Sequence, residues 1–432
     1  MIRRPFGFKA LAVLLLAGSA SAAPLTLDEA VRRARATHPS AQAAEAAVRA
    51  ASARVTAAEA GRLPSADVTE SWQRGNQPVY AFGSLLAQRR FLAESFALDY
   101  LNHPPATNNL RLGVTVEQPL FSPATNAGVR SARLVGEMAG TMRTAVQVDL
   151  RLAVTEAYAG LLAAAAQHRA AGQALEAAVA DRERTAHRRD AGRATEADVL
   201  QFDVLVARMR ARQARAAADE TVARARLNAL VGEPVEAATE VARPAAVAEA
   251  PADGEVTARP DVRLARTREA LAGADVERAR AAFLPQVVAQ AGWEANGGSW
   301  ATRSPSWVVG VMGRVNVFRG GADRAQLAAA KADADARAAE RRQTELAARV
   351  EVVAARARLE AALAAEVAGR SAVAQAVESR RIVRDRYEQG LAESVALLNA
   401  AELVVEAEAA DAAAAADVVM ARAALDRALG RE

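Results

Sequence analysis

Residues 188–200, RRDAGRATEADVL, and residues 386–398, RYEQGLAESVALL, are two versions of one motif. Each has a central glycine, Gly192 or Gly390, and each ends on an apolar pair, with an offset of 198 residues between the copies. Solenoid repeats have periods of roughly 20–50 residues. The sequence therefore predicts two copies of a domain-sized module rather than a solenoid.

The first 22 residues have the features of a secretory signal peptide. A basic start (Arg3, Arg4 and Lys9) precedes an apolar run over residues 10–17, and Ala20-Ser21-Ala22 is a small-residue cleavage pattern. The alternative, a transmembrane anchor, needs about 20 apolar residues. We expect residues 1–22 to be removed after export.

Removal of this peptide changes the charge of the chain. Three cations and no anions are lost, so the formal net charge falls from +4 to about +1. A near-neutral chain lacks the basic surface of a nucleic-acid-binding protein. We therefore expect no nucleic-acid partner.

The sequence lacks the residues that several kinds of chemistry require. The chain has no cysteine, and Lys331, the one lysine after the signal peptide, is not in a Walker A loop. We find no pairing of a nucleophile with a base and no histidines at ligand spacing, the four being His38, His103, His168 and His187. Met138 and Met142 fit either ordinary helix packing or a methionine step for copper or silver. We expect no enzyme activity, cofactor or resident metal.

Long helical segments dominate the pattern. We predict a helix over residues 25–61, a helix of about 65 residues over 123–190, and a helix from the Thr195 cap to residue 231. Helices over 260–283, 321–387 and up to 429 repeat this plan. The predicted division is a signal peptide (1–22), a first repeat (23–231), a proline-containing linker or equatorial segment (232–258) and a second repeat (259–432).

Each repeat also holds two amphipathic strands, predicted at about residues 63–80, 108–120, 285–296 and 305–318. Leu110, Leu112 and Val114 alternate with Arg111 and Thr115, a period of two. Some 27 residues, 81–107, join the first pair, whereas about ten residues, 296–305, join the second.

The strand length fits two environments, a soluble sheet packed on helices or a membrane barrel, whose strands need about 9–11 residues. The attached helices, at 1.5 Å per residue, are about 100 Å long and point away from the sheet. The smallest closed barrels have about eight strands, and an open sheet edge is forbidden in lipid. Four strands in a membrane therefore require several copies of the chain.

The ordered motifs resemble the TolC family of outer-membrane efflux proteins over essentially the whole mature chain. The motifs are Leu25-Thr26-Leu27-Asp28-Glu29-Ala30-Val31 followed by Pro39, Arg62-Leu63-Pro64, Gln118-Pro119-Leu120-Phe121, Arg259-Pro260-Asp261, Phe283-Leu284-Pro285, Phe318-Arg319-Gly320-Gly321 and the two glycine-centred turns. Each motif alone is weak, but the ordered set within a duplication is specific.

The resemblance implies an α+β membrane protein with a duplicated helix-strand-strand-helix-helix repeat. It implies a homotrimer in which a 12-stranded outer-membrane β-barrel, surrounded by outer-membrane lipid, continues as a long periplasmic α-helical barrel. The implied function is a passive exit duct of a tripartite efflux or type I secretion system in a Gram-negative envelope. A periplasmic adaptor, or membrane fusion protein, would couple the duct to an inner-membrane transporter.

The resemblance also assigns roles to the two turns, which form the periplasmic tip in this family. The implied adaptor-contact residues are Gly192, Arg193, Thr195, Asp198, Val199 and Leu200 in the first repeat and Gly390, Leu391, Ser394, Leu397 and Leu398 in the second. For the leucines, the alternative is a coiled-coil core.

Closure of the tip is implied at Asp198, Tyr387 and Asn399. Tyr387 and Asp198 match the family's closing tyrosine and aspartate, whereas its arginine falls on Ala392. The two aspartates of its selectivity ring fall on Ala396 and Asn399. We therefore expect a tip closed by apolar and hydrogen-bond contacts and less cation-selective than relatives with the ring.

Two alternatives remain open. A soluble periplasmic coiled-coil structural or adaptor protein would explain the long helices, although it leaves the four strands and the duplication unexplained. The connection 81–107 either constricts the external mouth or is an ordinary surface loop.

Overall fold

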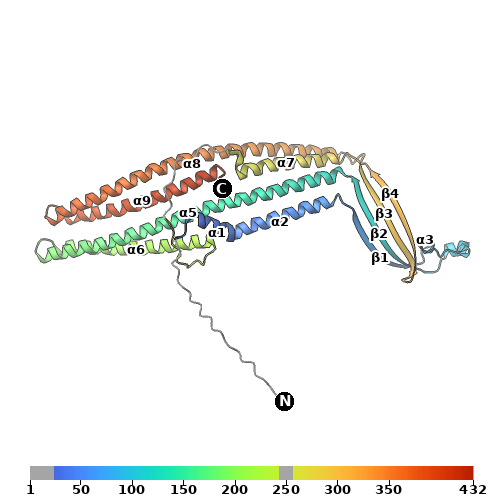
Figure 1. Ribbon diagram of the computed structural model, residues 1–432, viewed down its shortest axis with the longest axis horizontal. Helices are drawn as coiled ribbons and strands as arrows, with labels where there is room; N and C mark the ends of the chain where they lie inside the picture. Colours follow the sequence, from blue (N-terminus) through green and yellow to red (C-terminus); the bar gives the residue numbers. More distant parts are fainter. Residues whose placement is uncertain (1–23, 243–255, 432) are drawn as a thin grey trace, which may run out of the picture.

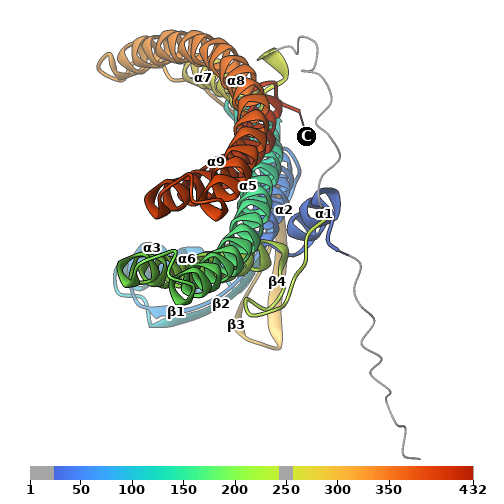
Figure 2. The same cartoon turned by 90° about the vertical axis from the view of Figure 1, so that its left-hand side faces the viewer.

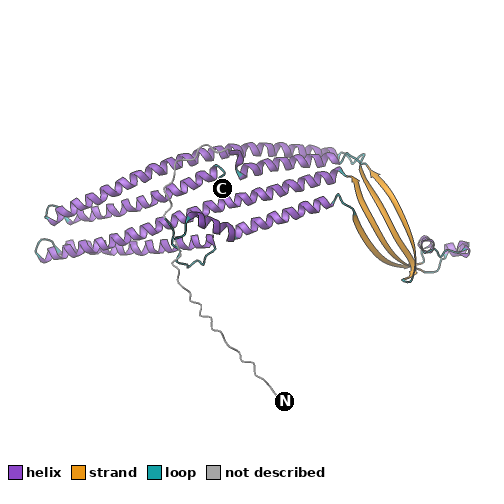
Figure 3. Cartoon of the chain, viewed as in Figure 1, coloured by secondary structure: helices purple, strands orange, loops and turns teal. Residues whose placement is uncertain are grey.

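The computed structural model describes residues 24–242 and 256–431. The predicted signal peptide, residues 1–22, and residues 243–255 of the predicted linker lie outside the described part of the chain. Helices run side by side along most of the length, and a small sheet lies at one end (Figures 1 and 3). Figure 2, which looks along this length, shows the helices arranged in an open arc.

Two very long helices span the helical region. They are α5 (Pro123–Asp190, 68 residues) and α8 (Ala322–Glu388, 67 residues), each about 100 Å long at 1.5 Å per residue. The helices α6 (Glu196–Val231) and α9 (Ser394–Ala428) run back along them from the tips. Within the described ranges, no helix is both long and apolar enough to cross a membrane.

The helices before each strand pair differ from one another. The second repeat has one helix, α7 (Pro260–Ala281), as predicted. In the first repeat the predicted helix 25–61 is two helices, α1 (Leu27–Thr37) and α2 (Pro39–Ala60). Pro39 causes the break, because the residue before a proline is driven to extended backbone, and His38 has φ −66° and ψ 133°.

The sheet contains β1 (Ser65–Gly75), β2 (Thr107–Phe121), β3 (Gln286–Ser299) and β4 (Thr302–Arg314). All neighbours are antiparallel and the order is β1-β2-β3-β4. Each repeat supplies two adjacent strands, so the join between repeats in the sheet is the β2–β3 pair.

Four predicted strand ends are wrong, namely the end of β1, the end of β3 and both ends of β4. The first strand stops at Gly75 rather than residue 80, because Pro78 takes the first position of a helix, α3 (Pro78–Ala87), and the Gln77 side chain caps it. The last strand stops at Arg314 rather than 318. The predicted ten-residue connection is a tight hairpin, since β3 continues to Ser299, which pairs with Thr302.

The rest of the first connection is also structured. After α3 come a 3-10 helix, η1 (Ala93–Phe96), and a short helix, α4 (Leu98–Asn102). Another 3-10 turn, η2 (Val256–Ala258), precedes α7. The 27-residue connection is therefore a small helical subdomain at the far end of the sheet (Figure 1).

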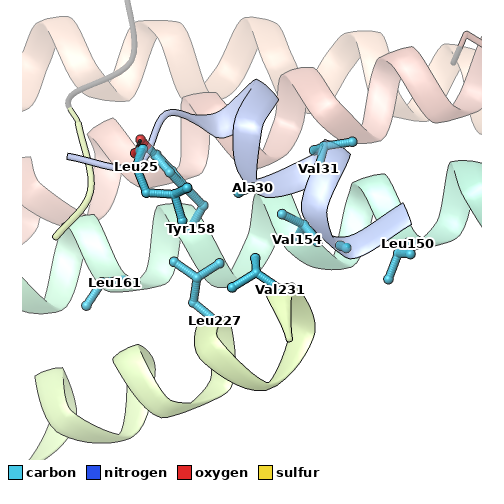
Figure 4. Close-up of a cluster of buried hydrophobic side chains, with 10 residues drawn as sticks. Leu25, Ala30, Val31, Leu150, Val154, Tyr158, Leu161, Leu227 and Val231 are labelled. Carbon is cyan, nitrogen blue, oxygen red and sulfur yellow. Dashed lines mark hydrogen bonds between the residues drawn. The ribbon is translucent and has the colours of Figure 1, made fainter. Parts of the chain in front are cut away.

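The buried apolar residues form separate clusters along the helices. One cluster, at mid-length, joins α1, α5 and α6 through residues that include Val31, Val154 and Leu227 (Figure 4). Tyr158 is fully buried there, and its hydroxyl lies 2.8 Å from the carbonyl oxygen of Leu25 and 2.6 Å from that of Ala242. This contact holds the residues just before α1 and the segment after α6 against the middle of α5.

Candidate functional site

The sheet has one wholly apolar face in its middle rows. The register places Val68, Val114, Trp293 and Trp307 opposite one another across all four strands. Two residues toward the helices, the next row of this face is Ala66, Val116, Ala291 and Val309. Directly opposed residues of antiparallel strands lie on the same face of a sheet. The apolar residues of all four strands therefore lie together on one surface.

Much of this apolar face is uncovered. Val68 is 71% exposed, Trp307 is 78% exposed and Val311 is 67% exposed. A β-branched or aromatic side chain gains about 1.5–3 kcal/mol when it is taken out of water. A row of such side chains left in water predicts that another apolar phase or another molecule covers this face.

The opposite face is polar. One of its rows is Thr69, Gly113, Glu294 and Ser306. Arg111 forms an ion pair of 2.7 Å with Glu294, and Gln290 donates to Glu117 at 3.0 Å. A sheet that is apolar on one side and polar on the other matches the alternation of strands that separate lipid from a water-filled lumen.

Aromatic side chains mark both ends of the strands. At the hairpin end, Trp72 and Trp300 are 65% and 69% exposed, and the Arg303 guanidinium lies 4.6 Å from the Trp300 ring centroid. At the helix end, Phe121 and Phe318 are 47% and 81% exposed. Aromatic girdles at both interfaces are typical of membrane-spanning strands.

The two edge strands of the sheet, β1 and β4, each have one side without a partner strand among the described residues. Within the described residues, β1 pairs only with β2 and β4 pairs only with β3. Exposed edges attract further strands, and a closed barrel is the arrangement that satisfies both edges. The β1 edge and the β4 edge thus each present backbone groups that no other described strand of this chain pairs with.

At the opposite end of the molecule, both tips use the same turn. Gly192 has φ 70° and Gly390 has φ 79°, backbone that glycine adopts without a steric penalty. The N–H of Arg193 donates to the carbonyl of Arg188 at 2.8 Å, and that of Leu391 donates to the carbonyl of Arg386 at 2.8 Å. These six-residue closures are Schellman motifs, which end a helix sharply and allow the chain to reverse.

A polar contact joins the two tips to each other. Thr195 caps α6 in a capping box with Asp198, as the sequence predicts for the cap. Ser394, from the other tip, donates its hydroxyl to Asp198 Oδ1 at 2.6 Å. The hydroxyl of Ser394 and the N–H and hydroxyl of Thr195 lower the pKa of Asp198, because they all stabilise the carboxylate.

The candidate adaptor-contact residues fall into two groups. Val199, Leu397 and Ser394 are 2%, 1% and 6% exposed, so they form the interior of this chain's own tips. Asp198 and Leu398 are partly buried. The remaining candidates are exposed to solvent and are Gly192, Arg193, Thr195, Leu200, Gly390 and Leu391.

The three candidate closure residues are not brought together within one chain. The Tyr387 hydroxyl lies 3.2 Å from Thr185 Oγ1, and Arg188 stacks 4.6 Å from the centroid of the Tyr387 ring. Asp198 instead binds Ser394, and Asn399 is exposed. The polar partners of Tyr387 therefore come from α5, while Phe202 of α6 packs beside its ring at a centroid distance of 6.4 Å.

Sequence reasoning missed an ion pair near the tips whose carboxylate is fully buried. The Asp181 carboxylate, on α5, is 0% exposed and accepts from Arg380 of α8 at 2.8 Å and from Arg184. The one available signal was its separation of 199 residues, close to the 198-residue offset between repeats. Among the described residues no group of three or more His, Asp or Glu side chains could hold a metal ion.

Comparisons with known proteins agree with this geometry. The model of the family described as "Outer membrane efflux protein" matches residues 30–233 and 256–431. The search among curated proteins found no match. The fold is similar to those of several solved structures.

The outer membrane protein VceC from Vibrio cholerae shares 22% identity at a TM-score of 0.80, covering 94% of this chain and 96% of its own. The outer-membrane channel OprN shares 25% identity at a TM-score of 0.80, with coverages of 94% and 90%. The CmeC outer membrane channel from Campylobacter jejuni shares 16% identity at a TM-score of 0.81, with coverages of 94% and 85%. The fold is therefore that of outer-membrane channels with a helical barrel and added strands.

Proposed function

Because this chain belongs to the outer membrane efflux protein family and is an outer-membrane efflux duct with periplasmic helices, we propose that three copies share one 12-stranded barrel. The observation that carries the proposal is the four-stranded sheet, apolar on one exposed face and unpaired at both described edges. Four strands fall short of the roughly eight that close a barrel. Three copies of the sheet, joined β1 to β4, provide twelve.

The apolar face would contact outer-membrane lipid, and the polar face would line the duct. The 68-residue and 67-residue helices would continue that duct through the periplasm. Transport through such a duct is passive, so a tripartite efflux or secretion system would supply its energy from an inner-membrane transporter.

We propose that the tips bind a periplasmic adaptor through their exposed residues. Arg193, Thr195 and Leu200 offer a mixed polar and apolar surface on the first tip, and Leu391 is 64% exposed on the second. Val199 and Leu397 would act indirectly, since their burial sets the positions of the two turns.

Closure of the duct would involve the same end. The contact of Ser394 with Asp198 and that of Tyr387 with Thr185 tie the two tips of one chain together. Asn399 is exposed near the tip and would face a neighbouring copy. This closure depends on hydrogen bonds and apolar packing rather than on an acidic ring.

Electron microscopy of the detergent-extracted protein tests the assembly. We expect side views of a tube about 100 Å long below a detergent disc, end views with three-fold symmetry, and single-channel currents in planar bilayers. Rods released by osmotic shock, without a disc and without currents, would contradict the duct and favour a soluble coiled-coil protein.

Site-directed crosslinking tests the adaptor surface. The chain has no cysteine, so a single Leu391→Cys variant carries one reactive thiol. We expect it to crosslink to the adaptor in cell envelopes. Leu403→Cys is the control, because Leu403 is a half-exposed leucine on α9 that lies away from the tip. Equal crosslinking of both variants would argue against a tip-specific contact.

A further inference from the structure

The helical segment between β1 and β2 is docked on the polar face of the sheet. Gln88, directly after α3, donates its side-chain amide to Asn109 Oδ1 at 3.1 Å and to the Asn108 carbonyl at 2.7 Å. Asn109 in turn donates to Asn296 Oδ1 at 2.9 Å. The register places Asn109 and Asn296 on the same face as Glu294, opposite to the row of Trp293.

This amide relay is buried. Gln88, Asn109 and Asn296 are 4%, 8% and 2% exposed, and Ala81 and Leu85 of α3 are also buried. Buried amides that satisfy one another give a rigid, specific contact, because any other arrangement leaves a polar group without a partner. The segment is therefore held in one position.

The same segment also reaches β4, the strand farthest from its own hairpin. Ser304 donates its hydroxyl to the Gln88 carbonyl at 2.9 Å, and Arg89 donates to the Pro305 carbonyl at 3.1 Å. Arg89 is the one non-glycine residue with positive φ, 54°, within the described ranges. Gly298 leaves the room that the segment needs, since a Cβ there would lie 2.6 Å from Arg90 Nη1.

The docked segment leaves apolar side chains in solvent. Val79 is 76% exposed, Phe96 is 66% exposed and Leu98 is 76% exposed. Phe82, Phe91 and Phe96 pack edge to face with ring centroids 4.7 and 4.9 Å apart, which stiffens the segment beneath them. Nothing else in the described part of this chain covers Val79, Phe96 and Leu98.

We propose that residues 78–106 form a fixed apolar constriction inside the external mouth of the duct, and that the same segment of the other copies covers these side chains. This proposal rests on the function proposed above, in which the polar face lines the lumen. Every chain in a shared barrel would then place its α3 on the lumen side at the same end. The copies converge there, and an apolar ring restricts the passage of water and ions.

Single-channel conductance in planar bilayers tests this constriction. In one variant an Asn-Gly turn, which suits a two-residue hairpin, replaces residues 76–106. We expect its conductance to rise several-fold over that of the unaltered chain. A Gln88→Ala variant, which breaks the relay but keeps the segment, is expected to show noisy currents of intermediate size. Unchanged conductance in both variants would overturn the constriction while leaving the duct intact.

Crosslinking between copies gives an independent readout that does not require the deletion variant to fold. A Leu98→Cys variant treated with a flexible bismaleimide is expected to give crosslinked dimers and trimers. Val311→Cys, on the apolar face of β4, is the control and is expected to stay monomeric on a denaturing gel. Absence of Leu98→Cys crosslinks in a protein that still conducts would contradict the proposal. A protein that forms no channel in any variant would contradict the proposed function itself.

Discussion

Asp181 and Arg380 form an ion pair of 2.8 Å that joins the two long helices near the tips, although 199 residues separate them in the sequence. The separation is close to the 198-residue offset between the repeats. Residues at equivalent positions of the two repeats therefore meet at the same height along neighbouring hairpins. This pairing aligns the hairpins lengthwise, so the two turns reach the same level.

Replacing Asp181 with alanine should loosen the tips. The carboxylate is 0% exposed, and its removal takes from Arg380 its ion-pair partner on α5 and leaves Arg184 with only the longer pair to Glu388 at 4.0 Å. Removal of one partner of a buried pair costs about 3–5 kcal/mol, and we expect the lower end because both arginines retain contact with water. Hydrogen exchange of peptides that contain the two turns measures the loss of protection.

Asp203→Ala provides the matched control for this change. Asp203 pairs with Arg182 at 2.9 Å on the same hairpin, but its side chain is 45% exposed. A surface pair contributes about 0–1 kcal/mol. Equal loss of protection in both variants would show that the burial of Asp181 has no special importance.

Ser394→Ala should destabilise the tip at neutral pH but less so in acid. Ser394 stabilises the Asp198 carboxylate and keeps its pKa below the usual 3.8. A group whose pKa is lowered by folding contributes its full stabilisation above the unfolded value and loses it as the pH falls through the folded value. The difference in the free energy of unfolding between the unaltered chain and Ser394→Ala should therefore be largest at pH 7 and shrink below about pH 4.

Urea unfolding at pH 7 and at pH 3 measures this difference. Loss of a hydrogen bond to a charged group costs about 1.5–3 kcal/mol, and the partial exposure of Asp198 favours the lower end. Ser371→Ala, at an exposed position of α8, is the control. A Ser394→Ala deficit that is equally large at both pH values would rule out a role for the Asp198 charge.

Alanine at the two turn glycines should have a small and equal effect. Gly192 and Gly390 have positive φ, but a Cβ at either position would meet no atom within 4 Å. The cost is then backbone strain alone, about 1–2 kcal/mol for each. At Gly232, which has φ 77°, a Cβ would also lie 2.6 Å from Thr37 Oγ1.

Gly232→Ala is therefore expected to be clearly more destabilising than either tip variant. The measurement is the urea midpoint of the three single variants under the same conditions. A tip variant that loses as much stability as Gly232→Ala would mean that each tip glycine makes a close contact in the assembled protein.

Arginine substitutions on adjacent residues of β4 should distinguish the two faces of the sheet. Val309 lies in the row of Ala291 on the apolar face, whereas Val308 lies opposite Gly292 on the polar face. An arginine that faces lipid near the bilayer midplane costs about 2–4 kcal/mol, but one that faces the lumen is tolerated. We expect Val309→Arg to reduce the folded fraction in lipid vesicles and Val308→Arg to preserve it.

Heat-modifiable mobility on denaturing gels measures that folded fraction. Both variants add the same side chain at neighbouring positions, so they differ only in the face of the sheet. If Val308→Arg folds worse than Val309→Arg, the assignment of lipid and lumen faces is reversed.

The prediction of helices from the sequence was accurate where the signal was local. The break at Gly192 and the cap at Thr195 placed the ends of α5 and α6 at the residues found in the structure. Capping and turn formation depend on residues within one or two helical turns, so they can be recognised without knowledge of the fold.

The prediction failed where a local pattern had two physical outcomes. Pro78 can end a strand or begin a helix, and the docking of α3 on the sheet decides for the helix. The surroundings of Tyr387, which include Thr185 of α5 and Phe202 of α6, depend on the rotation of α8 about its axis, and contacts between helices set that rotation. Neither rotation nor docking is encoded in the spacing of a single segment.

The sequence by itself determined the duplication, the long helices and the four amphipathic strands. Hydrophobic periodicity and the residues that begin and end helices depend only on residues close together in the chain. Only the tertiary structure decided which residues share a face and which ends meet. One row of the apolar face forms only when all four strands pair in the observed register, and its residues are Val68, Val114, Trp293 and Trp307. The Gln88 relay lies on the polar face because of that same register and because the connection between β1 and β2 folds back onto the sheet. Strand register and loop docking both arise from contacts between segments far apart in the chain.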